Sequence, residues 1–477
     1  MAGRWLARPV VLRYLGLFGA ICCGIDAFLF GAPTQIRIGV SVASILRGPN
    51  GVIIMLLWVV GLAALCTAWW YGLRLRGTGL LTQRWILVTA ALWIVPMLFG
   101  PPLGSRDMYA YACQGALFDA GLNPSVDAIS AQPCPWLDSV SMVWRDTPTP
   151  YGPLFIVLAG LAASFGSQAV ALAIFRVYAV LGLILLASVL PVLARRRDVP
   201  IDRALWLVLC CPLVGVHLVG GGHNDAVTMG LLVAGLAVIA GRSRRIGTLV
   251  AGGALIGAAI GVKTTIGVVL PFAALLAAGG PEWQRLIRRG GAVIGGAFAG
   301  MLVLSFGSGL GLGWLVALSG AGASQSWTSP PTAVGIAINA ITHLLGGHLD
   351  VVPAVRFAAL VLMPIVLVAI WWRSRRGDPL HGAGLACLAL VFLAPITQPW
   401  YLFWAIALFA VTAVNTRWLA GTVVLSMFLI LPDGDGAWKP LQVPLALLVT
   451  GLVGWVGYRA VGWLRKPEVV RCPAPIP

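Results

Sequence analysis

Residues 51–71 read GVIIMLLWVVGLAALCTAWWY, an apolar stretch that contains no charged side chain. Arg74 and Arg76 follow it almost at once. A helix that crosses the hydrocarbon core of a bilayer needs about 20 apolar residues. The stretch therefore predicts a membrane-spanning helix that ends in a basic joint.

The same pattern recurs along the whole chain. Its 477 residues are 59% apolar and 10% charged, whereas a soluble domain carries about 25% charged residues. This composition argues against a soluble enzyme, a disordered protein and a secreted disulfide scaffold. Further stretches of similar character lie at 14–31, 85–100, 168–193, 204–219, 226–240, 246–262, 264–279, 291–310, 353–372, 382–397, 401–414, 418–431 and 441–458. We expect a single all-α integral membrane domain over residues 1–477, with about 11–15 membrane helices.

The basic residues are concentrated in the short joints between these stretches. The chain carries 32 Lys and Arg against 15 Asp and Glu, a net charge of +17. The joints and termini hold 24 of the basic and five of the acidic residues, a net of +19, which leaves −2 for the rest. By the positive-inside rule these joints and both termini are cytoplasmic, as in a multi-pass plasma-membrane protein. Scattered basic joints form no continuous groove, so nucleic acid is not an expected partner.

The opposite face receives long polar segments. The longest predicted outer loop is 101–151, and a second one spans 311–352. The apolar run 152–166 is ambiguous; we interpret it as entering the outer leaflet and turning back, with one full crossing at 168–193. Cys113 and Cys134 share the first loop and could pair there, because that side is oxidising. Loops carry function more often than their scaffold does, so a site at the outer surface is expected.

Asp107 stands in the sequence SRD, shortly after a predicted span and beside Tyr109 and Tyr111. A local ion pair with Arg106 is one interpretation, and a general base is the other. The two tyrosines could equally belong to the aromatic belt of the membrane interface. We favour the general base, because the acid lies beside two tyrosines and shares the outer face with eight other acidic residues.

Two more motifs bring polar residues to this face. GGGHNDA at 220–226 presents His223, Asn224 and Asp225 together; a helix cap accounts for one of them but not for all three. Lys263 lies between two apolar runs, where an ionisable residue is a functional hypothesis by default, with a phosphate as its natural partner. Snorkelling to the interface is the alternative. Arg176, inside an apolar run, could neutralise a carboxylate or reach a lipid phosphate.

The sequence predicts no metal site and no bound cofactor. Its five histidines are dispersed, and no His/Cys spacing resembles a zinc motif. Glycine-rich nucleotide motifs are also absent from the sequence. A membrane enzyme without a nucleotide-binding site would have to take an activated substrate from another source, such as the lipid phase.

Taken together, the motifs resemble one family. These motifs are SRDMYAYACQG, GLNPS, WRDTPTPYGPLF, GGGHNDA, GVKTTIGVVLPF and TQPWYLFW, which occur in this order from about residue 100 to 405. They resemble the actinobacterial polyprenyl-phosphomannose-dependent α-1,6-mannosyltransferases, membrane glycosyltransferases of the C-type (GT-C) architecture. The resemblance implies a polyprenyl-phosphate-mannose donor and a lipid-linked α-1,6-mannan acceptor, as in lipomannan and lipoarabinomannan. It also implies transfer outside the cytoplasm, with the aspartate of the first outer loop, here Asp107, as the base.

Under this resemblance the remaining motif residues become substrate contacts. A carboxylate accepts the proton of the attacking hydroxyl, and cationic donors stabilise the departing phosphate. A β-linked donor and an α-linked product imply one inverting displacement. Aromatic faces suit pyranose rings. The expected substrate-binding residues are Arg106, Tyr109, Tyr111, Trp144, Tyr151, Arg176, His223, Asn224, Asp225, Lys263, Gln398, Trp400 and Tyr401.

Other functions stay open at this point. An α-1,2-mannosyl or arabinofuranosyl transferase of the same architecture would show the same general features. A lipid-sugar transporter or flippase is less favoured, because transporters place ionisable residues near the bilayer midplane and contain internal repeats. Here the polar motifs lie at one rim, and neither SRD nor HND recurs in the other half.

Overall fold

The computed structural model describes residues 8–37, 39–75, 78–243, 245–318, 326–412 and 416–465. Within these ranges the chain is helical, and the only pairing of β type is an isolated bridge between Ile430 and Gly436. The predicted all-α, polytopic fold class is confirmed. Among the basic residues expected in cytoplasmic joints, those outside the described ranges are Arg4, Arg76, Arg244, Lys466 and Arg471.

Six helical segments of the described chain are long and apolar enough to cross a membrane. They are Pro9–Phe30 (α2), Gly51–Gly72 (α4), Gln168–Arg196 (α9), Trp283–Gly307, Val352–Ser374 (α18) and Lys439–Arg459. The segment Trp283–Gly307 joins α14 (Trp283–Arg285), η6 (Leu286–Gly290) and α15 (Gly291–Gly307), whereas Lys439–Arg459 joins η9 (Lys439–Leu441) to most of α22 (Gln442–Arg465). A seventh span is possible where α10 (Ile201–Leu209) and the π-helix η4 (Val214–Gly220) meet at a bend of 57°.

Shorter apolar helices fill the space between these spans. They are α5 (Gln83–Ile94) with η1 (Val95–Leu98), α8 (Pro153–Ala163), α11 (Asp225–Ile239), α12 (Ile246–Val262), η5 (Thr264–Val269) with α13 (Leu270–Ala278), α19 (Pro379–Leu393), and η8 (Pro399–Tyr401) with α20 (Leu402–Phe409). The number of complete crossings thus depends on how many of these reach across the bilayer, and 11–15 stays a prediction. The 11 residues of α8 rise about 16 Å at 1.5 Å each, a length suited to a helix that enters one leaflet and turns back.

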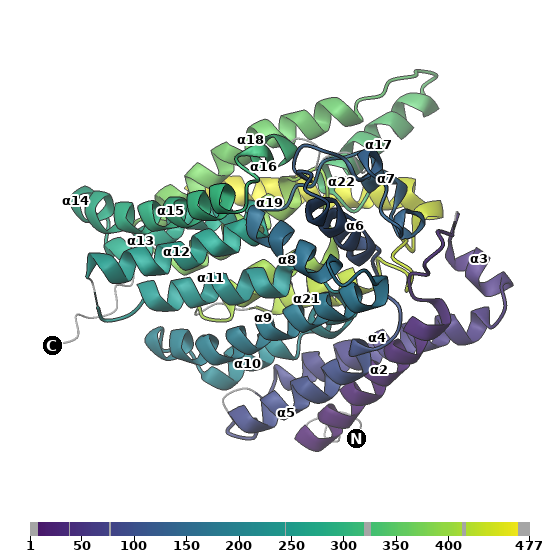
Figure 1. The fold of residues 1–477 in the computed structure, drawn as a ribbon, viewed down its shortest axis with the longest axis horizontal. Helices are drawn as coiled ribbons and strands as arrows, with labels where there is room; N and C mark the ends of the chain where they lie inside the picture. Colours follow the sequence, from purple (N-terminus) through teal and green to yellow (C-terminus); the bar gives the residue numbers. More distant parts are fainter. Residues whose placement is uncertain are drawn as a thin grey trace.

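The remaining elements are short or lie at the ends of the bundle. They are α3 (Val42–Arg47), α6 (Asp107–Asp119), η2 (Ile129–Ala131), η3 (Leu137–Ser139), α7 (Met142–Arg145), α16 (Gly313–Ala317), α17 (Pro330–Leu344) and α21 (Arg417–Met427). Figure 1 shows α3, α6 and α7 at one end of the helical bundle, whereas α14 and the joint between α11 and α12 lie at the opposite end. These two arginine-rich segments and the long first loop are therefore separated along the bundle.

Close backbone contact between α9 and α11 sets the position of the HND motif. A Cβ atom added at Gly182 of α9 would lie 2.5 Å from the carbonyl carbon of Ala226, and one added at Gly230 would lie 2.6 Å from the carbonyl oxygen of Gly182. Small residues allow membrane helices to approach this closely. The crossing fixes the first turn of α11, which begins at Asp225.

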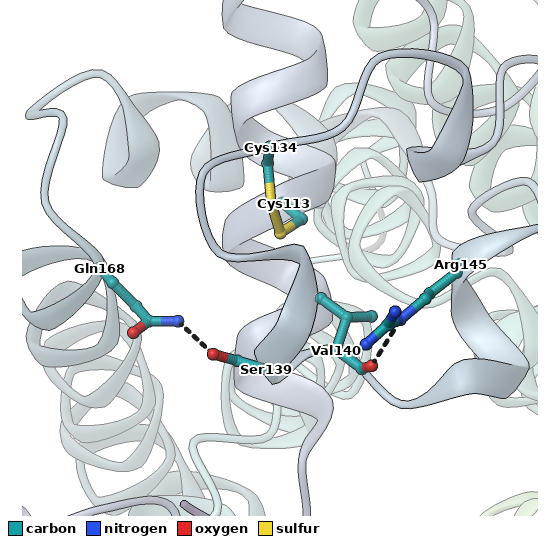
Figure 2. The surroundings of a disulfide bond; sticks show 6 residues. All are labelled: Cys113, Cys134, Ser139, Val140, Arg145 and Gln168. Carbon is teal, nitrogen blue, oxygen red and sulfur yellow. Dashed lines mark hydrogen bonds between the residues drawn. A yellow bond between two sulfur atoms is a disulfide. The ribbon is translucent and has the colours of Figure 1, made fainter. Parts of the chain in front are cut away.

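A disulfide bond between Cys113 and Cys134 ties the first long loop to α6 (Figure 2). Cys113 lies on α6, and the loop that carries Cys134 continues to Ser139, whose hydroxyl accepts a hydrogen bond from Gln168 at 3.0 Å. Arg145 donates to the carbonyl oxygen of Val140 at 3.0 Å. These bonds hold the loop against α6 and the start of α9.

Candidate active site

A cavity of about 1080 Å³ opens among segments that are far apart in the sequence. Its walls come from the start of α6, the end of the first long loop, the α12–η5 junction, residues 326–328, residues 394–404 and the loop after α21. Eight of the predicted site residues line it: Arg106, Asp107, Trp144, Tyr151, Lys263, Gln398, Trp400 and Tyr401. The fold thus gathers most of the motifs around one space.

Asp107 is the first residue of α6 and lies on the cavity wall. Its backbone N–H donates to the Ser105 hydroxyl at 3.1 Å, and 21% of its side chain is exposed. Burial raises the pKa of Asp107 to about 6, although Lys263 and a hydrogen bond from Ser105 oppose this shift. At neutral pH the side chain is therefore mainly a carboxylate with an appreciable proton affinity, as a general base requires.

His223 lies behind Asp107 and outside the residues that line the cavity. Its side chain has no exposed surface, and its Nδ1 atom lies 3.6 Å from Asp107 Oδ2 and 3.5 Å from the Tyr111 hydroxyl. Its ring stacks on Trp400, with the centroids 3.8 Å apart. Burial lowers the pKa of His223 well below its usual value, so a neutral imidazole supports both the base and an aromatic wall of the cavity.

Lys263 and Asp225 form an ion pair between the α12–η5 junction and the start of α11. Lys263 Nζ lies 2.9 Å and 2.8 Å from the two carboxylate oxygens of Asp225. Trp404 Nε1 also donates to Asp225 Oδ1 at 2.6 Å, and Lys263 Nζ lies 4.6 Å from the ring centroid of Tyr401. Asp225 is fully buried and Lys263 is 7% exposed, yet Lys263 lines the cavity.

Asn224 and Tyr151 complete the layer around these two pairs. Asn224 Oδ1 lies 3.5 Å from Lys263 Nζ, which is a long hydrogen bond. The Tyr151 hydroxyl donates to that of Tyr111 at 3.4 Å, and their rings meet edge to face. The HND motif thus contributes one residue behind Asp107 and two residues around Lys263.

Three of the predicted site residues bind backbone carbonyl groups; Arg106 also lines the cavity, whereas Arg176 and Tyr109 do not. Arg176 Nη2 donates to the carbonyl oxygens of Gly100 at 2.8 Å, Pro101 at 3.3 Å and Gly220 at 3.4 Å. The Tyr109 hydroxyl donates to Ala32 O at 2.8 Å. Arg106, on the cavity rim, donates to Pro33 O at 2.5 Å and to Ser139 O at 3.2 Å. These contacts tie the start of α6 to residues 32, 33 and 139, and they tie α9 to residues 100, 101 and 220.

Two acidic residues on the cavity wall were not among the predicted ones. Asp433 and Asp435 come from the sequence PDGDG after α21, and both line the cavity together with Lys439 and Arg37. Two acids alternating with glycines in an outer segment are a usable signal, but turn formation explains the same pattern. Only the packing of this loop against Ser105 shows that it borders the site.

The described residues contain no group of three or more His, Cys, Asp or Glu side chains placed to hold a metal ion. Lys263 and Arg106 are the cationic side chains of the predicted motifs that line the cavity. The arrangement thus offers a carboxylate base, an ammonium group and several aromatic faces. Together these groups suit the transfer of a sugar from an anionic leaving group to a hydroxyl.

Comparison with known proteins assigns the family. A family model described as "Alpha-(1->6)-mannopyranosyltransferase, N-terminal domain" matches residues 13–279, and one described as "MptB C-terminal domain" matches residues 331–459. The chain belongs to the α-(1→6)-mannopyranosyltransferase family. As a member of this family it is a multi-pass membrane enzyme that transfers mannose, which requires a sugar donor and a mannan acceptor.

Named relatives come from mycobacteria and corynebacteria. The chain is 35% identical to alpha-(1->6)-mannopyranosyltransferase A of Mycobacterium tuberculosis, over 87% of this chain and 83% of the relative. It is 30% identical to a probable alpha-(1->6)-mannopyranosyltransferase of Mycolicibacterium smegmatis, over 96% and 90%. It is 27% identical to alpha-(1->6)-mannopyranosyltransferase A of Corynebacterium glutamicum, over 76% and 78%. No solved structure matches the chain. The α-1,6-mannosyltransferase family that the motifs resemble is confirmed.

Proposed function

We propose that this mannosyltransferase moves mannose from polyprenyl-phosphate-mannose to the 6-hydroxyl of a lipid-linked α-1,6-mannan, with Asp107 as general base. The observation that carries the proposal is the placement of Asp107 and Lys263 on the wall of one cavity. A carboxylate and an ammonium group are the two charges that such a transfer needs, one for the incoming hydroxyl and one for the departing phosphate.

The reaction follows as a single displacement. The acceptor O6 attacks the anomeric carbon of the donor, the bond from that carbon to the phosphate oxygen breaks, and Asp107 receives the O6 proton. The electron pair of the broken bond stays on the leaving polyprenyl phosphate. The positive charge of Lys263 stabilises the negative charge there. Because one displacement inverts the anomeric configuration, a β-linked donor yields an α-linked product.

An apolar portion of the cavity suits the lipid of the donor. Leu360 and Met363 of α18 and Leu390 and Val391 of α19 line it, and Leu360 is 41% exposed. A prenyl chain lying along these side chains would remain in contact with the bilayer while its phosphate reaches the charged residues. The bilayer thus surrounds the helices of the enzyme and also supplies its lipid-linked donor.

Two features support an orientation of the enzyme in the membrane: the positive charge of its joints and the disulfide bond of its first long loop. Arginine-rich joints favour the cytoplasm, and a disulfide bond favours an oxidising compartment; the Cys113–Cys134 bond lies in the first long loop. We therefore place the cavity on the extracytoplasmic face of the plasma membrane and both termini in the cytoplasm.

A transfer assay tests the proposed reaction. Membranes containing the full chain are supplied with radiolabelled polyprenyl-phosphate-mannose and a synthetic α-1,6-dimannoside, and we expect a labelled trimannoside whose new bond is cleaved by an α-1,6-specific mannosidase. A pentose-linked polyprenyl phosphate should give no product. A product with an α-1,2 bond, or transfer of the pentose instead of mannose, would contradict the proposal.

Cysteine labelling tests the orientation. Val126 is 61% exposed in the first long loop, and the six free cysteines of the described chain are buried. In a Cys472→Ser background, Val126→Cys should react with a membrane-impermeant maleimide on intact cells. As the matched control, Ser243→Cys in the joint between α11 and α12 should react only after permeabilisation. The reverse pattern would place the cavity in the cytoplasm.

A further inference from the structure

The loop that follows α21 forms one wall of the cavity and is held rigidly. Gly104 N–H donates to Pro432 O at 2.7 Å, and Leu431 N–H donates to Asp435 O at 2.7 Å. Gly434 has a φ of +97°, and a Cβ atom added there would lie 2.9 Å from Ser105 Cα. The loop is therefore fixed against Ser105, two residues before the proposed base.

Asp433 is the buried polar residue of this wall. It is 4% exposed and lines the cavity. Its Oδ1 atom accepts a hydrogen bond from Asp435 N–H at 3.2 Å, whereas no hydrogen bond or ion pair to its Oδ2 atom occurs among the described residues. A carboxylate oxygen that has no protein partner keeps its capacity to accept a hydrogen bond. Its position on the cavity wall means that a hydroxyl group in the cavity can supply that partner.

The side chains next to Asp433 suit a sugar better than a lipid. Lys439 Nζ pairs with Asp435 Oδ1 at 2.8 Å, and both line the cavity together with Arg106 and Trp144. Hydroxyl groups both donate and accept, so they pair with a mixed set of carboxylates and cations, and an aromatic ring can cover a pyranose face. The apolar portion from α18 and α19 has no such groups among its lining residues.

We propose that Asp433 is an acceptor-binding residue that accepts a hydrogen bond from a ring hydroxyl of the mannan acceptor. This inference rests on the proposed function and adds to it by assigning one wall of the cavity to the acceptor. The bond holds the terminal mannose against the loop that packs on Ser105, so that the attacking hydroxyl lies near Asp107. Asp433 thereby contributes to acceptor affinity rather than to the chemical step.

Steady-state kinetics of Asp433→Asn separates acceptor binding from donor binding and from chemistry. The Asn side chain retains Oδ1 as the acceptor for Asp435 N–H but replaces the second oxygen by a donor. Loss of one hydrogen bond to a charged group lowers affinity by roughly tenfold or more. With the full-length enzyme in membranes and an α-1,6-dimannoside as acceptor, we expect the acceptor KM to rise about tenfold, with kcat and the donor KM changing less than about threefold.

Asp350→Asn is the matched control. Asp350 also accepts a hydrogen bond from the backbone two residues on, Val352 N–H at 3.2 Å, but it does not line the cavity. Its kinetic constants should equal those of the wild type. An unchanged acceptor KM in Asp433→Asn, or a rise confined to the donor KM, would overturn the inference while leaving the proposed function intact.

A direct binding measurement tests the role of Asp433 in acceptor affinity without turnover. Titration of the purified full-length protein with dimannoside, followed by tryptophan fluorescence, should show about tenfold weaker binding for Asp433→Asn than for the wild type. Equal affinities would overturn the inference even if the wild type failed to transfer mannose. Conversely, if the wild type failed to transfer mannose but Asp433→Asn bound the dimannoside more weakly, only the proposed function would be overturned.

Discussion

Replacement of Asp107 by Asn should lower kcat by about 10²–10⁴-fold, the usual contribution of a general base. The amide matches the carboxylate in size, and the backbone N–H of residue 107 can still donate to Ser105, so the fold should be retained. Since the base acts in the transition state, kcat and kcat/KM should fall together, with little change in either KM. The measurement is mannose transfer at saturating donor and acceptor.

The control variant is Asp127→Asn, in the same loop. Asp127 accepts a hydrogen bond from Asn123 N–H at 3.1 Å and does not line the cavity, so its transfer rate should stay near that of the wild type. Transfer at the wild-type rate by a well-expressed Asp107→Asn protein would rule out Asp107 as the base.

The pH dependence of mannose transfer by the wild type also tests the role of Asp107 as the base. Burial raises the pKa of Asp107 to about 6. Below this pH the carboxyl group is protonated and cannot accept another proton, so kcat/KM should fall about tenfold per pH unit. Burial also raises the pKa of Asp433 to about 6. Because Asp433 is expected to affect the acceptor KM and not kcat, the low-pH limb of kcat should persist in Asp433→Asn and disappear in Asp107→Asn.

The second large effect concerns the buried pair of Lys263 and Asp225. Removal of one partner leaves the other charge buried and unpaired, which costs about 3–5 kcal/mol. Lys263→Met and Asp225→Asn should each lower the thermal unfolding temperature in detergent. The double variant, which has neither charge, should regain most of that stability, because the Asn oxygen can still accept from Trp404 Nε1.

Activity should not follow stability in this set of variants. Without the positive charge of Lys263 the leaving phosphate loses its electrostatic partner, so the double variant should transfer mannose about 10²–10³-fold more slowly than the wild type. Combined stability and rate measurements on the four proteins form a double-mutant cycle. A double variant that is both stable and fully active would show that the pair has a structural role alone.

Much of the fold could be predicted from sequence, because hydropathy and charge are properties of single segments. The run at 51–71 corresponds to α4, Gly51–Gly72, and the run at 168–193 corresponds to α9, Gln168–Arg196. Helix lengths were harder to predict. The apolar stretch at 204–219 is bent by 57° between α10 and η4, and such a bend depends on packing rather than on apolar composition.

The site was predictable as a set of motifs but not as an arrangement. Asp107 and Lys263 are unusual enough in their surroundings to be selected from the sequence alone. The structure distinguishes the residues around them: Arg176 binds three backbone carbonyl groups, and His223 lies behind the cavity wall. Asp433 was missed because a glycine-rich acidic turn is common in loops that have no role in a site.

The sequence by itself determined that this protein is an all-α membrane protein of a mannosyltransferase family. It also determined which joints between the helices carry the positive charge. These properties follow from the composition of each segment and from the order of the motifs. Only the tertiary structure decided which polar side chains face one another, Asp107 with His223 and Lys263 with Asp225. The physical reason is that these contacts depend on helix crossings such as that of α9 and α11, which sequence spacing does not specify.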